Sequence, residues 1–285
     1  MILIIGGTGN VGRHVVAALV GRGEPARVLT RDPGRARKLL GTGAEIVAGD
    51  LTDPSSLGPA LRDVEKAYLA TNGGDQVRME SNAIEAAQRA GVGQIVKLSG
   101  FLAAHPTVNV YGQAHAGIEE RLAASAIPAT ILRPNWFMEN FLGAAETIAG
   151  DGAIYGAAAD GKAAFVDARD IAAVAVTALT ENGHTGRTYA ITGPEALTFA
   201  EAAAEIGAGI DREVRYVDLP DTDFRGALAG AGLPGDLVEL FAQSYRAARL
   251  GLYDGVSGVV EELTGARART LEAFARDYAG AFAGA

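Results

Sequence analysis

The sequence predicts an α/β fold: a doubly wound parallel sheet with helices on both faces, joined to a smaller and mainly helical part. Three observations lead to this prediction. Short aliphatic or β-branched runs alternate with stretches of helical periodicity over the first 135 residues, and a glycine-rich turn follows the first run directly. The runs are apolar on both sides, as expected for strands covered on both faces. Strand–helix alternation of this kind gives a parallel sheet between layers of helices.

The predicted elements follow in regular order up to Pro134. Aliphatic runs predict strands at 2–5, 26–30, 44–48, 66–70, 94–98 and 129–132. The spacing of apolar residues predicts helices at 11–20, 77–89 and 114–124. In the last of these, Ile118 and Leu122 lie on one side and the charged residues lie elsewhere, so the helix has one face to bury.

Beyond Pro134 the alternation loosens. An amphipathic, aromatic-rich stretch covers 135–149, and a glycine-dotted stretch covers 150–162. The α/β pattern resumes at 163–166, 168–179 and 188–192; helices are then predicted at 198–207, 234–249 and 270–282, with a short strand at 214–217. We therefore predict two domains. Residues 1–133 and 163–192 form a dinucleotide-binding core, and residues 134–162 and 193–285 form a smaller substrate-binding domain.

Composition and charge exclude several classes of function. The chain has 34 acidic and 25 basic residues, a net charge of −9, so we expect no nucleic-acid partner. It has no cysteine, which excludes disulfides, cysteine nucleophiles and cysteine metal sites, and with only four histidines we expect no metal. We also expect no membrane segment, because no apolar run approaches about 18–20 residues. The chain opens on a strand-like run without a basic leader, which predicts a cytoplasmic protein.

The most informative motif is the run Ile-Gly-Gly-Thr-Gly-Asn-Val-Gly from Ile5 to Gly12, between the first strand and the first helix. Gly6 can leave the strand in a tight turn, and Gly9 lets the backbone come close to a pyrophosphate. Gly12 allows the helix to pack close to the sheet, and the first N–H groups of the helix face the negative charge. This is the Rossmann-type dinucleotide fingerprint. We assign cofactor binding in this loop to Gly6, Thr8, Gly9, Asn10, Val11 and Gly12.

Several segments resemble one family. The N-terminal glycine loop is similar to that of the extended and atypical short-chain dehydrogenases/reductases, and so is Gly49-Asp50-Leu51 after the third strand. The segments 131–141, 165–172, 251–254 and 263–265 resemble the NmrA-like branch, in particular its NAD(P)H:quinone oxidoreductases. The resemblance covers nearly the whole chain.

The resemblance implies further site residues. It implies that Asp50 and Leu51 contact the adenine, and that Pro134 and Asn135 lie beside the nicotinamide. Apart from the resemblance, the aromatics Trp136 and Phe137 after the sixth strand suit contact with a flat substrate, although these aromatics could equally belong to the core. The further cofactor-binding positions that the resemblance implies are Thr71, Asn72 and Ser99.

The end of the second strand bears on cofactor choice, because Arg31 and Asp32 stand side by side there. An acid would accept the ribose hydroxyls of NAD, and an arginine would pair with the 2′-phosphate of NADP. Asp32 precedes Pro33 and a helical stretch, so it suits a helix N-cap. No capping role is expected for Arg31. We therefore expect NADP(H) to be preferred, with NAD(H) possible.

The candidate catalytic residues are Ser99, Tyr111 and His115. Short-chain dehydrogenases use a serine and a Tyr-x-x-x-Lys motif to protonate the substrate oxygen, and this chain has histidine in place of the lysine. Tyr111 and His115 are four residues apart, one helical turn. His115 could donate a proton, or hold the nicotinamide ribose or a substrate oxygen, or simply bond a backbone group. Ser99 could face the nicotinamide or only cap the strand end.

We therefore predict an NAD(P)H-dependent oxidoreductase that transfers hydride to a quinone or a related aromatic carbonyl compound. A quinone accepts hydride readily, so positioning two flat rings can provide much of the rate. The alternative is a dinucleotide-binding regulator of the NmrA type that senses redox state without turnover. We expect a small-molecule aromatic or quinone substrate as the partner, and a monomer or homodimer.

Overall fold

The computed structural model describes residues 1–71, 73 and 75–283. Its internal contacts divide the chain into two units. Unit 1 comprises Met1–Ala104, Gln113–Arg133 and Ala168–Ala190, and unit 2 comprises His105–Gly112, Pro134–Asp167 and Ile191–Ala285. Residues 163–167, which we had placed with the dinucleotide-binding core, lie in unit 2, where Ala163 pairs with Leu197 and bridges to Tyr253.

Unit 1 is built on a seven-stranded sheet with the order β3-β2-β1-β4-β5-β6-β9, which confirms the predicted fold class. The strands are β1 (Ile2–Ile5), β2 (Ala26–Thr30), β3 (Glu45–Ala48), β4 (Lys66–Leu69), β5 (Gln94–Leu98), β6 (Ala129–Pro134) and β9 (Thr188–Ile191). The ladders from β3 through to β6 are all parallel. Parallel neighbours need crossover helices, and these cover the two faces of the sheet.

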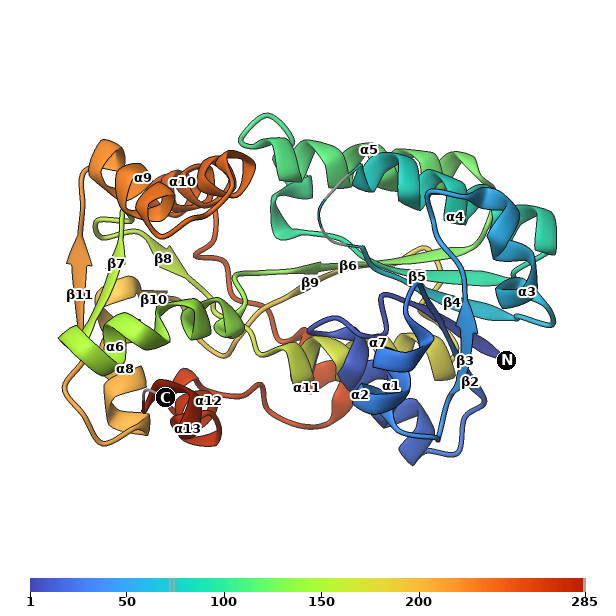
Figure 1. Cartoon of the computed structure of the whole chain (residues 1–285), viewed down its shortest axis with the longest axis horizontal. Coiled ribbons are helices and arrows are strands. Elements are labelled where there is room, and N and C mark those ends of the chain that lie inside the picture. The colour runs from blue at the N-terminus through green and yellow to red at the C-terminus, as the bar shows by residue number, and fades with distance from the viewer. Residues whose placement is uncertain (72, 74, 284–285) are drawn as a thin grey trace. The chain divides into compact units, whose positions relative to one another are not determined.

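Helices lie on both faces of this sheet (Figure 1). The helices of unit 1 are α1 (Gly12–Gly21), α2 (Pro33–Leu40), α3 (Gly58–Leu61), α4 (Gln76–Ala90), α5 (Val110–Ala124, whose first residues belong to unit 2) and α7 (Ala168–Thr180), with 3-10 turns η1 (Pro54–Leu57) and η2 (Phe101–Ala104). The α4 and α5 side holds a continuous core in which Leu69 and Ile95 from the strands meet Ile84 and Ile118 from the helices. Helices α1 and α7 pack together on the opposite face.

The strands are less uniformly apolar than predicted. Arg27, Gln94, Lys97 and Thr130 are all buried within the sheet. Each has polar partners: Arg27, for example, donates from Nε to Glu45 at 2.8 Å, and its Nη1 donates to the Ala60 carbonyl at 3.0 Å. A buried polar group is tolerated where its hydrogen bonds are made, and these partners come from elements that a strand pattern does not reveal.

The order of the strands positions the ligand-binding edge. β1 lies between β2 and β4, so the chain turns to one side after β1 and to the other side when it returns at β4. In such sheets ligands bind outside the carboxyl ends of the strands, at this point of reversal. The glycine loop leaves β1 there, and Thr71 follows the end of β4.

Unit 2 contains two small two-stranded sheets. The pair β7 (Ala153–Gly156) and β11 (Arg215–Asp218) is parallel, and the pair β8 (Lys162–Ala163) and β10 (Leu197–Thr198) is antiparallel. Its helical elements are η3 (Met138–Ala144), α6 (Ala145–Asp151), α8 (Phe199–Gly209), α9 (Asp221–Gly230), α10 (Gly235–Arg249), α11 (Val259–Thr264), α12 (Leu271–Asp277) and α13 (Ala279–Phe282). The glycine-dotted stretch 150–162 therefore contains a strand, β7, that the sequence did not predict.

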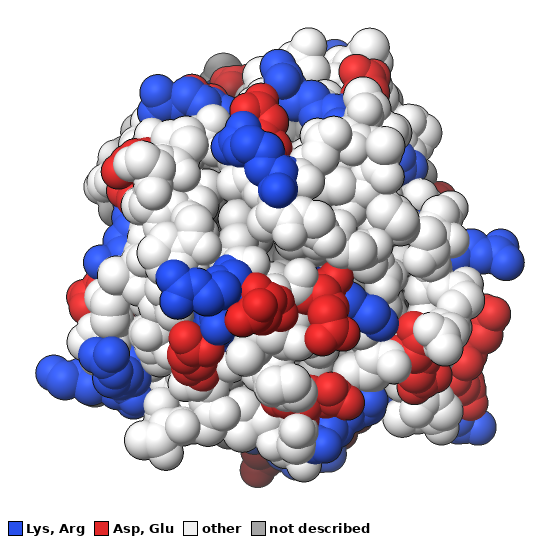
Figure 2. All heavy atoms as spheres, turned by 90° about the vertical axis from the view of Figure 1, so that its right-hand side faces the viewer, with Lys and Arg blue, Asp and Glu red and all other residues white. Residues whose placement is uncertain are grey.

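The surface carries charges of both signs. On the face shown in Figure 2, Lys and Arg side chains lie interspersed with Asp and Glu rather than gathered by sign. Within the described residues, no helix combines the length and apolar character needed to cross a bilayer.

Candidate functional site

The glycine loop after β1 is tightly closed at two of its glycines. Gly6 has a φ of +85°, which side chains rarely adopt, and a Cβ there would lie 2.3 Å from the Ala70 carbonyl oxygen. A Cβ on Gly12 would lie 2.1 Å from the Gly6 carbonyl oxygen. These two glycines therefore let the loop close on itself and on the chain after β4. Gly12 packs against the loop rather than against the sheet as the motif suggested.

Gly9 is different, because a side chain there would be less crowded. A Cβ on Gly9 would meet only the Gly6 carbonyl oxygen, at 3.2 Å, and its φ needs no glycine. Gly9 and Asn10 are exposed, and Thr8 is partly exposed. The cap residue of α1 is Val11, whose side chain accepts no hydrogen bond. An anion can thus take the role of a cap at this helix start, so the residues present fit a pyrophosphate.

Of the two residues after β2, Asp32 has the role that the sequence predicts for it. Its carboxylate Oδ1 accepts from the Arg35 backbone N–H at 2.9 Å, and Pro33 occupies the first position of α2. This confirms Asp32 as the helix N-cap. Arg31 is exposed at the end of β2. The positive charge of Arg31 is one of several causes that lower the pKa of the Asp50 carboxyl.

The segment after β3 is held by polar contacts. Asp50 Oδ1 accepts from the Thr52 backbone N–H at 2.8 Å and from the Thr52 hydroxyl at 2.9 Å, and these bonds lower the pKa of Asp50 more than Arg31 does. The Leu51 carbonyl accepts from Asn82 Nδ2 of α4 at 2.7 Å. Asp50 is therefore an anion at neutral pH, and the backbone of Leu51 is fixed at the carboxyl edge of the sheet.

The predicted residues after β4 and β5 are tied to side chains from α4 and α5. The Thr71 hydroxyl donates to Glu80 Oε1 at 2.7 Å, whereas Asn72 lies outside the described residues. The Ser99 hydroxyl donates to Glu119 Oε1 at 2.5 Å, and the Ser99 N–H donates to the Leu132 carbonyl at 2.7 Å. Arg133 binds the same Glu119 carboxylate through two nitrogens, one of them Nε at 3.1 Å. Since the Ser99 proton is directed to Glu119, the Ser99 oxygen is the atom available to accept a further bond.

His115 is buried on α5, one turn before Glu119. Its Nδ1 lies 3.4 Å from the ammonium nitrogen of Lys97, a residue of β5. A Cβ on Gly100 would lie 3.0 Å from His115 Cδ2, so the glycine after Ser99 makes room for the ring. Burial first, and the Lys97 charge second, hold the pKa of His115 well below its usual value. The imidazole is therefore neutral at pH 7.

The remaining predicted residues lie in unit 2. Tyr111 is partly buried at the start of α5 and close enough to Tyr253 to affect its pKa. Asn135 is buried: its Nδ2 donates to the Tyr253 carbonyl at 2.8 Å, and its Oδ1 accepts from the Trp136 N–H at 2.6 Å. Pro134, at the end of β6, is also buried.

The two predicted substrate-binding aromatics differ in exposure. Trp136 is only 7% exposed and packs edge-on against Phe199 and Tyr245, each with ring centroids 5.1 Å away. Phe141, the other aromatic of this stretch, is also in the core. Phe137 keeps part of its surface exposed. Of the two, Phe137 is therefore the one whose ring can meet a ligand without repacking unit 2.

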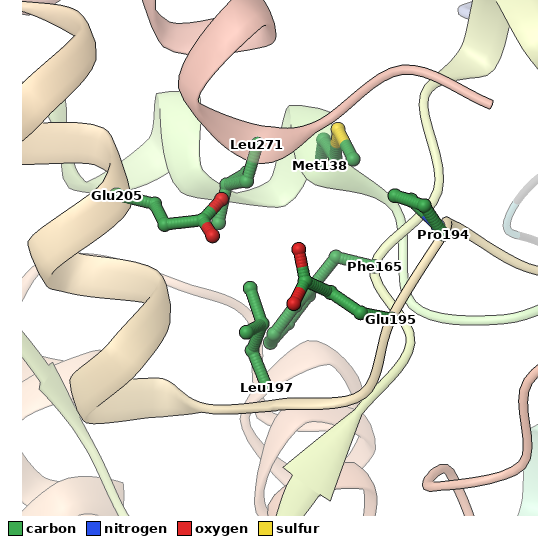
Figure 3. A pocket seen from close by; sticks show the side chains of 7 residues that line it. All are labelled: Met138, Phe165, Pro194, Glu195, Leu197, Glu205 and Leu271. Atoms are coloured by element: carbon green, nitrogen blue, oxygen red, sulfur yellow. The ribbon is translucent and has the colours of Figure 1, made fainter. Parts of the chain in front are cut away.

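Unit 2 also has a small hollow whose interior offers about 10 Å³, roughly the room that one water molecule needs. Figure 3 shows the carboxyl groups of Glu195 and Glu205 turned into it, beside Met138, Phe165 and Leu271. Burial and Glu195 raise the pKa of Glu205. Ligand pockets usually enclose about 300–1,000 Å³. This hollow is thus too small for a cofactor or a two-ring acceptor.

Sequence reasoning missed four charged side chains of the site, namely Lys97, Glu80, Glu119 and Arg133. One signal was present: a lysine between Val96 and Leu98 in a predicted sheet strand requires a buried partner. The residue that meets it, Glu80, lies on the predicted helix 77–89, but spacing alone does not pair a strand with a helix. No group of three His, Asp or Glu suited to a metal occurs among the described residues.

Comparison with known proteins places the chain among reductases. The NmrA-like family matches residues 1–275. The chain is 38% identical over 286 positions to an NAD(P)H azoreductase of Xenophilus azovorans, covering 100% of both chains. It is 39% identical over 285 positions to a (4-alkanoyl-5-oxo-2,5-dihydrofuran-3-yl)methyl phosphate reductase of Streptomyces griseus, covering 99% of each. An NADPH-dependent quinone oxidoreductase of Escherichia coli, solved in complex with NADPH, matches with a TM-score of 0.89 and 32% identity, covering 97% of this chain and 99% of that one.

Proposed function

The chain belongs to the NmrA-like family, and from this premise we propose that it is an NAD(P)H-dependent oxidoreductase that reduces a quinone or a related aromatic acceptor. One full-length relative is named an NAD(P)H azoreductase and another an NADPH-dependent quinone oxidoreductase, so reduction by a nicotinamide cofactor is common to both. The cofactor is NAD(P)H and the partner is a small molecule.

The glycine loop is the observation in the structure that carries this proposal. Gly6 and Gly12 are required by the fold of the loop itself, whereas a Cβ on Gly9 would meet the Gly6 carbonyl oxygen at 3.2 Å, a tight contact but a much milder one. A position kept free of a side chain, next to an uncapped helix start, suits a bound pyrophosphate. Cofactor contacts are assigned to Gly6, Thr8, Gly9, Asn10, Val11, Gly12, Asp50, Leu51, Thr71, Ser99, Pro134 and Asn135.

The preference for NADPH is assigned to Arg31. Its guanidinium is exposed at the end of β2, where the 2′-phosphate of a bound dinucleotide is expected. Asp32, the neighbour that could favour NAD instead, uses its carboxylate to cap α2. Arg35, Arg37 and Lys38 in the same helix add positive charge. A doubly charged phosphate is favoured in such a place.

When bound, NAD(P)H supplies the hydride that reduces the acceptor. His115 is neutral, so it offers a ring N–H as a hydrogen-bond donor and carries no charge. Ser99 offers its oxygen as an acceptor, because Glu119 takes its proton. Tyr111 and the exposed part of Phe137 are candidates for contact with the acceptor. A reduced quinone can take its protons from water, so none of these residues must act as an acid.

The test is NADPH oxidation, followed by absorbance, with a panel of quinones, azo compounds and aromatic carbonyls. We expect turnover with at least one quinone or aromatic acceptor, and loss of it in Gly9→Val. Tight NADPH binding without turnover on any acceptor would instead point to a redox-sensing regulator. A cytoplasmic location and a monomeric or homodimeric state stay predictions.

A further inference from the structure

Lys97 is an unusual residue for the middle of a parallel sheet. Its side chain and that of Glu80 are both 0% exposed, and Lys97 Nζ lies 3.0 Å from Glu80 Oε2 and 3.1 Å from Oε1. A buried ion pair adds little net stability, because the cost of removing both charges from water offsets their attraction. Apolar residues of similar size would serve the fold as well. The pair therefore calls for a role besides stability.

The ammonium is held in place from several directions. Glu80 is itself fixed, since its Oε1 accepts from the Thr71 hydroxyl at 2.7 Å and from Gln76 Nε2 at 3.3 Å. Lys97 Nζ also donates to the Leu98 carbonyl. Nζ also lies 3.4 Å from His115 Nδ1. The network thus runs from Glu80 on α4, through β5, to α5.

This contact determines which ring nitrogen of His115 carries the proton. A lysine ammonium has three donors and no acceptor, so a nitrogen that bonds to it must present a lone pair. Nδ1 of His115 is that nitrogen, and a neutral imidazole must then carry its proton on Nε2. The Nε2 edge lies against the backbone after β5: a Cβ on Gly100 would be 3.5 Å from it. This is the carboxyl edge of the sheet, where ligands bind.

We propose that Lys97 is a positioning residue, which holds His115 as a neutral imidazole with its proton on Nε2 and directs that N–H to the carboxyl edge of the sheet. The inference rests on the proposed function and refines it. His115 donates a hydrogen bond of constant strength and does not deliver a proton. Lys97 of β5 is the charged group seen in contact with the ring among the described residues. Glu80 of α4 pairs with Lys97, and Glu119, one turn further along α5, pairs with Arg133 of β6. The Lys97 cation, which lies closest, opposes protonation of His115.

Nitrogen NMR of the histidine rings tests this without any turnover. In ¹⁵N-labelled protein, the signals of His115 are identified as those lost in His115→Gln. We expect one protonated and one bare nitrogen, with the proton on Nε2, unchanged from pH 5 to pH 8. A proton on Nδ1, or a charged ring near pH 6.5, would overturn the inference. The spectra of the wild-type protein are enough to show either result.

Two variants test whether Lys97 is the cause. Lys97→Met is combined with Glu80→Gln, so that no unpaired carboxylate is left in the core. In this double variant we expect His115 to lose its single Nε2–H form and its ring to become partly charged at low pH. Lys97→Arg restores a cationic donor and should restore that form. The matched control is Lys66→Met, on the neighbouring strand, whose Nζ donates to the Leu179 carbonyl instead. A folded double variant with wild-type ring signals would refute the role of Lys97.

Kinetics separates this inference from the proposed function. If the chain turns over a quinone, kcat/KM of the wild type should not change from pH 5 to pH 8. In the double variant kcat/KM should depend on pH over this range, because the His115 ring then ionises. If no acceptor is reduced, the proposed function fails, while the ring signals still decide the inference. If neither variant folds, the wild-type spectra decide it.

Discussion

Replacing Arg31 with alanine should weaken NADPH binding and leave NADH binding nearly unchanged. A 2′-phosphate carries about two negative charges, and losing a charged hydrogen-bond partner costs about 1.5–3 kcal/mol. Arg31 is exposed and already lies within the field of Asp50, so we expect the lower end, about tenfold in dissociation constant. Because salt screens an exposed pair, the effect should shrink at high ionic strength.

The assay is calorimetric titration of both cofactors into the wild type and the variant. Arg35→Ala is the matched control, since it removes a nearby exposed arginine from α2 and should change the NADPH to NADH ratio much less. Asp32→Ala should lower the unfolding free energy by about 0.5–2 kcal/mol through loss of the helix cap, with the ratio kept. If Arg31→Ala left the ratio unchanged while Asp32→Ala sharply weakened NADH, the two roles would be reversed and the enzyme would be NAD-dependent.

Three further predictions concern glycines and a carboxyl. Gly6→Ala should destabilise the fold by at least about 1–2 kcal/mol in denaturant titrations, because of its positive φ and the contact with Ala70; an unchanged midpoint would contradict this. Gly9→Val should keep a normal melting curve and lose NADPH binding, so near-normal affinity in a folded variant would count against a pyrophosphate at this loop. The pKa of Glu205 is raised, so its protonated carboxyl is favoured in the folded protein. This contribution to stability is full at low pH and is lost as pH rises through the raised value. Glu205→Gln should therefore stabilise at pH 7, by about 0.2–0.5 kcal/mol for relief of like-charge repulsion, and not at pH 4, as thermal melts would show.

The architecture of unit 1 followed from local patterns. The predicted bounds of β1 and β2 match the structure, and the predicted cap at Asp32 is present. These features depend on neighbours within a few residues, which is what periodicity and capping rules describe. The strand β7 was missed because its partner, β11, lies about 60 residues further along the chain, and its glycine-rich surroundings resemble a loop.

The candidate site was predicted in part. The glycine loop was located from its spacing. The tight turn at Gly6 is present, whereas Gly12 packs against the loop itself rather than against the sheet. The surroundings of His115 did not follow, because its charge state depends on Lys97 and on burial, both products of tertiary packing. Trp136 illustrates the same limit: an aromatic after a strand can line a site or fill a core, and the rings that surround it come from residues 165, 199, 245 and 253.

The aromatic core of unit 2 has a consequence for synthesis on the ribosome. Trp136 is made early, but its ring partners Tyr245 and Tyr253 are made about 110 to 120 residues later. A nascent chain that ends before residue 245 therefore exposes large apolar rings, the condition that recruits chaperones or leads to aggregation. Limited proteolysis of stalled chains should find the 134–167 segment open to cleavage until residue 253 has emerged, and protected afterwards. Protection in shorter chains would show that this segment packs without its C-terminal partners.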